Sequence, residues 1–271
     1  MNRIVLAGLL AVITALPLTA QQRAAETEQE KLGARQFNQA IAAYSAGNYE
    51  ESIPLFIAAD TLIGETDLVD WTKLRFALGT AFLETGKPNL ALGYFQWVAE
   101  RDSSYPFIYL QIAESARTGG KRTEALDYYR KALSRARPAD QAMILGRIGE
   151  LELAAGRLQA ALGALNRAIK LTPAVGYFLM RGQLYDRLAQ RVDHAQDEEF
   201  DYERAIRRKE LTEEQMEQAT ELRRKALEDY RSAERDAKLA DTCANLIARS
   251  EVILENNAQV ISEIKFQREN N

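Results

Sequence analysis

The single histidine of the chain, His194, lies in an acidic stretch and is the first candidate for chemistry. Asp193 precedes it, and four more acidic residues follow by position 201. An imidazole with several carboxylates is a donor set that divalent metals accept. The stretch has no second histidine and no loop glycine at a fixed spacing, and acidic runs commonly form solvated helix faces. The sequence therefore predicts a charged surface here and no metal site.

Two other features suggest chemistry, and each has a simpler interpretation. Gly119-Gly120-Lys121 resembles part of a phosphate-binding loop. Ser115 and Arg122 occupy the positions where that loop needs a further glycine and a hydroxyl residue, so the match fails. Cys243 falls on an apolar helical stripe, which predicts a core residue rather than a nucleophile.

Composition narrows the function classes. No nucleophile and base are arranged for activation, so the sequence predicts a chain that is not an enzyme and needs no cofactor. One cysteine excludes an intramolecular disulfide. A net charge of −4 over 271 residues argues against a nucleic-acid partner.

The elements that must position these residues recur along the chain. Four segments consist of an apolar helix, a turn glycine and a second helix, and the glycines are separated by 39, 34 and 36 residues. Five residues after each glycine stands a small residue, and four further on a bulky one. Small residues let antiparallel helices approach closely, and the bulky residue fills the space beside them. The three sets are Gly47, Gly86, Gly120 and Gly156; Ser52, Ala91, Ala125 and Ala161; Phe56, Phe95, Tyr129 and Leu165.

This pattern resembles the tetratricopeptide repeat family over residues 33–175, as four consecutive units. The resemblance implies an all-α fold, a right-handed α-solenoid of helix-turn-helix repeats. The turn glycines are expected to adopt positive φ, which ends the first helix of each unit. The sequence departs from the pattern at Glu152, which occupies the aromatic position of the fourth unit.

The apolar periodicity places the helices within these units. Pro88, Pro106 and Pro138 are each expected to open a helix, where the missing N–H costs nothing. The expected helix pairs are 33–46 with 49–63, 68–85 with 88–101, 106–118 with 122–136, and 139–155 with 158–171.

Residues 176–240 are interpreted as a fifth, stretched unit. Gly182 and Tyr185 fit its first half, and Ala226 and Tyr230 fit its second. Between them, 190–225 holds 19 charged residues out of 36. Thr212 with Gln215 forms a capping box, which predicts a helix from there to about 238 and an inserted helical hairpin. The alternative is a charged loop that buries too little to order itself.

The last segment, 241–271, is predicted to contain a helix over 241–267 that covers the end of the solenoid. Cys243, Ile247, Leu254 and Ile261 form its apolar stripe. The near-heptad spacing leaves a second interpretation open, a dimerising coiled coil.

The first 20 residues have the form of a secretory signal peptide. A positive tip precedes an apolar run, and cleavage is predicted after Ala20. The run is shorter than the roughly 20 residues that span a bilayer, although an uncleaved anchor is the alternative. We expect a periplasmic or secreted protein with no transmembrane segment after cleavage, in which 21–32 forms an N-terminal segment before the repeats.

The resemblance also implies a partner-binding groove lined by the first helix of each unit. Its apolar residues suggest an extended or helical apolar peptide as ligand. The alternative is that these side chains pack the helices together. The candidate groove residues are Phe37, Ile41, Tyr44, Phe76, Leu83, Phe107 and Leu110.

Two functions follow from this sequence. The first is an exported scaffold that binds another protein or peptide of the cell envelope through the groove. The second is a structural accessory of an envelope assembly or polymer-export complex, which self-associates through the charged hairpin and the last helix.

Overall fold

The computed structural model describes residues 20–63, 70–195, 197 and 199–270, with side chains from Glu28 onward. The chain forms two compact units, Met1–Tyr105 and Pro106–Asn271, called here unit 1 and unit 2. All regular structure of the described residues is α-helical, which confirms the predicted all-α repeat fold. The predicted signal peptide lies outside the described residues except for Ala20.

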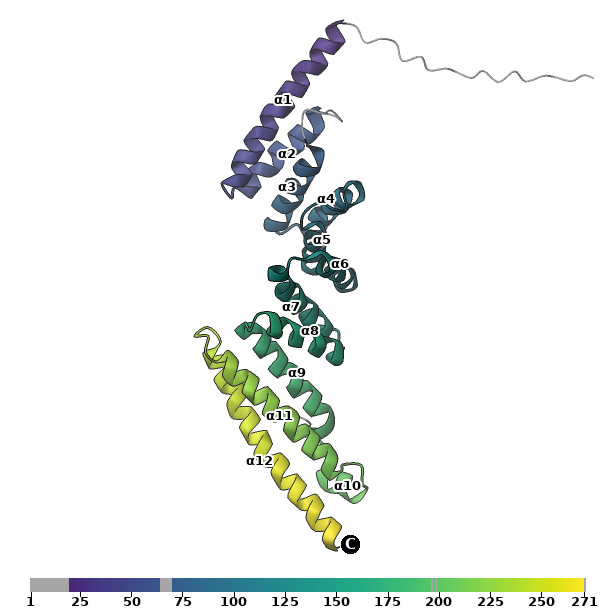
Figure 1. The fold of residues 1–271 in the computed structure, drawn as a ribbon, viewed down its shortest axis with the longest axis vertical. Coiled ribbons are helices and arrows are strands. Elements are labelled where there is room, and N and C mark those ends of the chain that lie inside the picture. Colours follow the sequence, from purple (N-terminus) through teal and green to yellow (C-terminus); the bar gives the residue numbers. More distant parts are fainter. Residues whose placement is uncertain (1–19, 64–69, 196, 198, 271) are drawn as a thin grey trace, which may run out of the picture. The chain divides into compact units, whose positions relative to one another are not determined.

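Unit 1 consists of two antiparallel helix pairs (Figure 1). Helix α1 packs on α2, and α3 packs on α4, with α2 also contacting α3. The bounds are α1 Ala20–Ser45, α2 Tyr49–Ile63, α3 Trp71–Glu84 and α4 Pro88–Arg101.

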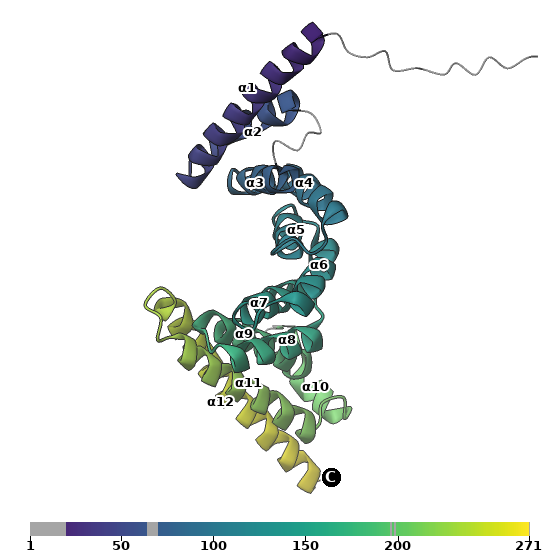
Figure 2. The same cartoon turned by 45° about the horizontal axis from the view of Figure 1, so that its top comes forward.

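Unit 2 continues with two short pairs and then a group of longer helices. Helix α5 pairs with α6, and α7 with α8. Helix α9 packs along α11, and α12 packs along the other side of α11, so that the three run side by side (Figure 2). The bounds are α5 Ile108–Thr118, α6 Arg122–Arg135, α7 Pro138–Ala154, α8 Leu158–Leu171, α9 Val175–Asp193, α10 Tyr202–Arg207, α11 Glu213–Ala233 and α12 Ala240–Asn270.

The repeat chemistry predicted from the sequence is confirmed at the turns and in the core. All four turn glycines have positive φ, between 72° and 81°, which L-residues other than glycine adopt only at a cost. The four bulky residues and the three alanines paired with them are fully buried. Ser52 is the small residue of the first repeat. It is buried, and its hydroxyl donates a hydrogen bond to the carbonyl of Tyr49.

Three helix starts differ from the prediction by two residues or more. Helix α3 begins at Trp71 rather than 68, because the Asp70 side chain caps it by accepting a hydrogen bond from the Lys73 N–H. Helix α1 begins at Ala20 rather than 33, because the intervening residues are mainly Ala, Glu, Gln and Lys, which favour helix without any apolar pattern. Helix α5 begins at Ile108 rather than at Pro106. Phe107 takes the left-handed conformation, with φ of 60°, and a right-handed helix cannot pass through it.

The fifth helix pair keeps the repeat geometry in a longer form. Helix α9 continues to Asp193, short helix α10 follows, and α11 begins after Thr212 with the predicted capping box. Helix α11 ends at Ala233, earlier than the predicted 238. Ala205, Leu211 and Met216 form a small core with Val260, Ile261 and Ile264 from α12.

Candidate binding surfaces

The groove residues of unit 1 come together on α1 and α3. Phe37 and Tyr44 both lie against the buried ring of Phe56, with ring centroids 6.2 Å away in each case. These two side chains are nevertheless only half-buried. They therefore serve the packing of the α1–α2 pair and leave part of their surface to solvent.

A second aromatic contact extends this surface along α3. The Phe76 ring lies 5.3 Å from buried Phe95 and 4.8 Å from Tyr105, measured between centroids. The Tyr44 phenol lies beside Thr80 on α3, and burial raises its pKa. Ile41 and Leu83 are half-buried. Unit 1 thus presents an aromatic surface with two phenol groups, from Tyr44 and Tyr105.

The remaining groove residues, Phe107 and Leu110, belong to unit 2. Phe107 is 49% exposed, and the guanidinium of Arg137 lies 5.2 Å from its ring centroid. Leu110 is half-buried on α5. The groove position of the third repeat is thus held by one of the most exposed aromatic side chains of unit 2.

Charged groups form a buried network between α9, α11 and α12. Arg223 of α11 is fully buried, and its Nε and Nη2 donate to the two carboxylate oxygens of Asp193 at 3.0 and 3.1 Å. Its Nη1 donates to Asp186 at 2.9 Å, and the Tyr230 hydroxyl donates to the other oxygen of Asp186 at 2.5 Å. Burial alone lowers the pKa of Arg223, but the bonds to Asp193 and then Asp186 outweigh it and raise that pKa.

Asp193 also fixes the end of α9. Its carboxylate accepts hydrogen bonds from the backbone N–H of Ala195 at 3.1 Å and from Asn257 Nδ2 of α12 at 3.3 Å. Its carbonyl oxygen accepts the hydroxyl hydrogen bond of Tyr202. The fully buried Asp193 therefore joins the C-terminus of α9 to α11 and α12 through its carboxylate and to α10 through its carbonyl.

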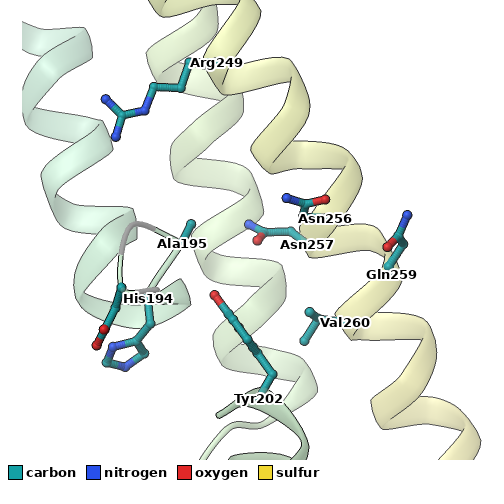
Figure 3. Close-up of a pocket in the computed structure, with 9 residues that line it drawn as sticks. His194, Ala195, Tyr202, Arg249, Asn256, Asn257, Gln259 and Val260 are labelled. Atoms are coloured by element: carbon teal, nitrogen blue, oxygen red, sulfur yellow. The ribbon is translucent and has the colours of Figure 1, made fainter. Parts of the chain in front are cut away.

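A polar pocket of about 570 Å³ lies beside this network, between the loop after α9 and helix α12 (Figure 3). Figure 3 shows the Tyr202 ring between His194 and Val260. The other lining residues are Ala195, Asp197, Arg249, Asn256, Asn257 and Gln259. The pocket is lined mainly by amide, hydroxyl and charged groups.

His194 has a conformational role in this pocket. It caps α9 in the left-handed conformation, with φ of 50°, and its ring stacks on Phe200 at 4.0 Å with an interplanar angle of 4°. Within the described ranges, no three His, Cys, Asp or Glu residues gather as metal ligands. Cys243 is fully buried, as its position on the apolar stripe predicts, and its thiol is free.

Two carboxylates form pairings between helices: buried Glu152, which explains the departure from the repeat pattern at its position, and half-buried Glu114. Glu152, 2% exposed, accepts hydrogen bonds from Arg130 Nη2 at 2.8 Å and from Arg157 Nε. Glu114 accepts the Tyr129 hydroxyl at 2.6 Å, and burial together with this bond raises the pKa of Tyr129. Sequence reasoning missed both pairings. The signal in the sequence is an acidic residue at a position whose helical phase is otherwise apolar.

The helix pairs and their turn glycines match a known repeat family. The tetratricopeptide repeat profile matches residues 76–141 and, overlapping them, 110–176. Residues 76–176 of this chain are tetratricopeptide repeats. The matched residues run from α3 into α9 and contain three of the four turn glycines of the repeat protein.

Solved structures share the fold of this tetratricopeptide repeat protein. The MamA RS-1 ArsTM double mutant is 18% identical, with a TM-score of 0.53 over 75% of this chain and 98% of that chain. MamA 41-end from Desulfovibrio magneticus RS-1 is 16% identical, with a TM-score of 0.51 over 74% and 96%. At these identities the similarity concerns the fold alone. No curated protein sequence matches the chain.

The tetratricopeptide repeat is a non-catalytic type of scaffold for protein–protein interaction, and the matched repeats account for the helices from α3 to α8. Among the described helices, none has both the length and the apolar character needed to cross a bilayer.

Proposed function

We propose that this tetratricopeptide repeat protein is an exported scaffold of the cell envelope that binds a protein or peptide partner through its groove residues. The observation that carries the proposal is the half-exposed aromatic surface of unit 1, formed by Tyr44, Phe76 and Tyr105. Aromatic side chains that remain partly exposed beside a packed core are typical anchors of protein interfaces.

The chemistry of this surface favours a partner with apolar side chains. The rings offer apolar area, and the hydroxyl groups of Tyr44 and Tyr105 offer hydrogen bonds at its edge. Groove-bound peptides commonly combine apolar anchors with such polar contacts. On unit 1, the groove predicted from the sequence adds Phe37, Ile41 and Leu83; its other two residues, Phe107 and Leu110, belong to unit 2.

Site-specific photocrosslinking in intact cells tests the partner-binding part. A photoreactive phenylalanine analogue placed at Phe76 or at Tyr44 is expected to trap one discrete partner. The matched control is Asn89, exposed at the start of α4 and outside the first helices of the repeats. Identical crosslink patterns from Asn89 and Phe76 contradict groove binding.

The export part has its own test. The intact mass of the protein released by osmotic shock is expected to correspond to a chain beginning at Gln21. A full-length mass in the membrane fraction supports the retained anchor instead, and a full-length mass in the cytosol contradicts export.

Self-association is a second candidate function, favoured by exposed apolar side chains on α12. Val252 is 57% exposed and Phe266 is 61% exposed. Sedimentation velocity tests whether the intact protein self-associates, by measuring its mass at several concentrations. The same measurement is made on the variants Val252→Glu and Phe266→Glu. A mass that depends on concentration and falls in both variants supports assembly through α12. A monomer at every concentration removes this candidate.

A further inference from the structure

The polar pocket between the loop after α9 and helix α12 has two lining side chains that the Asp193 network holds in place (Figure 3). Asn257 is 2% exposed, and because a carboxylate can only accept, its Nδ2 faces Asp193 at 3.3 Å and fixes the amide plane. The hydroxyl of half-buried Tyr202 is held by its bond to the Asp193 carbonyl. Both side chains are therefore ordered without a ligand, which lowers the entropic cost of binding one.

Each of these two fixed side chains keeps an acceptor atom that no described residue uses. Asn257 directs its Nδ2 to Asp193, so its Oδ1 remains to accept a hydrogen bond. Tyr202 has donated its one hydroxyl proton to a carbonyl, so its oxygen can take part in a further bond only as an acceptor. A ligand that contacts both atoms must therefore donate hydrogen bonds.

Three further lining side chains stand at exposed positions of α12 and can donate. They belong to Arg249, Asn256 and Gln259, and within the described ranges these side chains form no hydrogen bond or ion pair. A guanidinium only donates, whereas each amide offers both donors and an acceptor. A ligand with several groups that both donate and accept can therefore bond to all three.

The pocket also has a small apolar area and balanced charge. Figure 3 shows the Tyr202 ring between His194 and Val260, and all three side chains are half-buried. Among the described lining residues, Arg249 is the one cation and Asp197 the one anion, with His194 neutral at pH 7. The volume of about 570 Å³ lies within the range of about 300–1,000 Å³ that small-molecule sites span. The lining thus favours an uncharged polar ligand that has apolar faces of its own.

We propose that this pocket binds a neutral sugar. Hydroxyl groups of the sugar donate to the side-chain oxygens of Asn257 and Tyr202. Other hydroxyl groups bond to the amides of Asn256 and Gln259, and the C–H face of the sugar ring packs on Val260 beside the Tyr202 ring. The site lies within unit 2 and shares no residue with the groove of the proposed function, so the inference goes beyond that function.

An anionic ligand is a poorer fit to the same pocket. Arg249 would attract a carboxylate, but the Asp197 carboxylate belongs to the same lining and opposes it. The fixed acceptor oxygens of Asn257 and Tyr202 would also repel the oxygens of an anion, which have no proton to donate. A neutral ligand with several hydroxyl groups meets neither obstacle, so it is the class we assign.

Saturation-transfer NMR titrations on the intact protein test the proposal. The probes are the methyl glycosides of glucose, galactose, mannose and N-acetylglucosamine, with cyclohexanol as a less polar ring and glucuronate as an anionic sugar. We expect at least one glycoside to bind with a Kd of about 1 mM, and both comparison ligands to bind at least about tenfold more weakly. The absence of saturation transfer to every glycoside overturns the proposal, as does equal or tighter binding of cyclohexanol or glucuronate.

A pair of double variants places the binding in the pocket. Asn256→Ala with Gln259→Ala is expected to weaken binding of that glycoside about tenfold, because two hydrogen-bonding groups are lost. The melting temperature is expected not to fall, since neither amide bonds to a described residue.

The control is Asn89→Ala with Gln159→Ala. It removes the same two amides from exposed positions on α4 and α8, and its affinity for the glycoside is expected to stay within about twofold of the unchanged protein. Unchanged affinity in the pocket variant, or equal losses in both double variants, overturns the sugar site.

Discussion

The ring of Tyr230 lies directly over Gly182, so closely that a Cβ on Gly182 would come within 2.6 Å of the Tyr230 Cε1 atom. The same contact joins Gly79 to Phe95 and Gly149 to Leu165, where the Cβ would lie 2.9 and 2.8 Å from the partner side chain. Sixteen residues separate each of those two pairs, but 48 separate Gly182 from Tyr230. The fifth helix pair therefore makes the same glycine contact as the repeats. It has 32 additional residues between the glycine and the side chain that packs on it.

Gly182→Ala is expected to destabilise the protein by about 1–3 kcal/mol, because the fully buried Tyr230 ring cannot move aside. Urea unfolding measures the change. The control is Gly163→Ala on α8, where an added Cβ meets no atom within 4 Å. There the better helix propensity of alanine is expected to add about 0.5–1 kcal/mol. The same sign for both substitutions contradicts the close packing at Gly182.

Arg223→Ala is expected to cost about 3–5 kcal/mol, because it leaves the buried Asp193 carboxylate without its charge partner. Arg231→Ala breaks the exposed pair with Glu251, whose side chains are 57% and 51% exposed, and is expected to cost about 0–1 kcal/mol. Chemical denaturation of the two variants gives the comparison. Similar small losses for both show that the Asp193 network contributes little.

Alkaline pH is expected to destabilise the protein through its buried tyrosines. Burial and the neighbouring carboxylates raise the pKa of Tyr129 and of Tyr230 above the ordinary value near 10. A raised folded-state pKa means that the stabilisation is complete below pH 10 and is lost as the pH rises above it. Each tyrosine is expected to reduce the free energy of unfolding by about 1.4 kcal/mol per pH unit there.

Urea titrations at pH values from about 9 to about 11 measure that slope, because this range brackets the ordinary tyrosine pKa of about 10. Tyr230→Phe is expected to make the slope shallower, although it also removes the hydrogen bond to Asp186. A slope that is the same in Tyr230→Phe and the unchanged protein assigns the alkaline loss to other groups.

Cys243 is expected to report whether α12 stays docked on α11. The thiol is fully buried, and burial raises its pKa, so two effects slow its reaction with a disulfide reagent. We expect slow labelling in the native protein and fast labelling in denaturant. Asn257→Ala, which removes the hydrogen bond from α12 to Asp193, is expected to accelerate native labelling. Immediate labelling of the native protein contradicts stable docking of α12.

The sequence by itself determined the repeats. Four turn glycines at fixed distances from small and bulky residues specify helix pairs, because a positive φ and a close helix approach each admit few residue types. The apolar phase likewise predicted that Cys243 is buried. These features are local or recur at a fixed spacing, so they can be read along the chain.

Only the tertiary structure decided how residues distant in sequence pair. The sequence predicts that the acidic stretch around His194 is a charged surface, yet Asp193 in that stretch is fully buried against Arg223, 30 residues away, because α9 and α11 are long enough to face each other there. Glu152 departs from the repeat pattern in the sequence, and only the fold brings Arg130 and Arg157 to its carboxylate. Charge pairing has no sequence period, so packing must choose the partners.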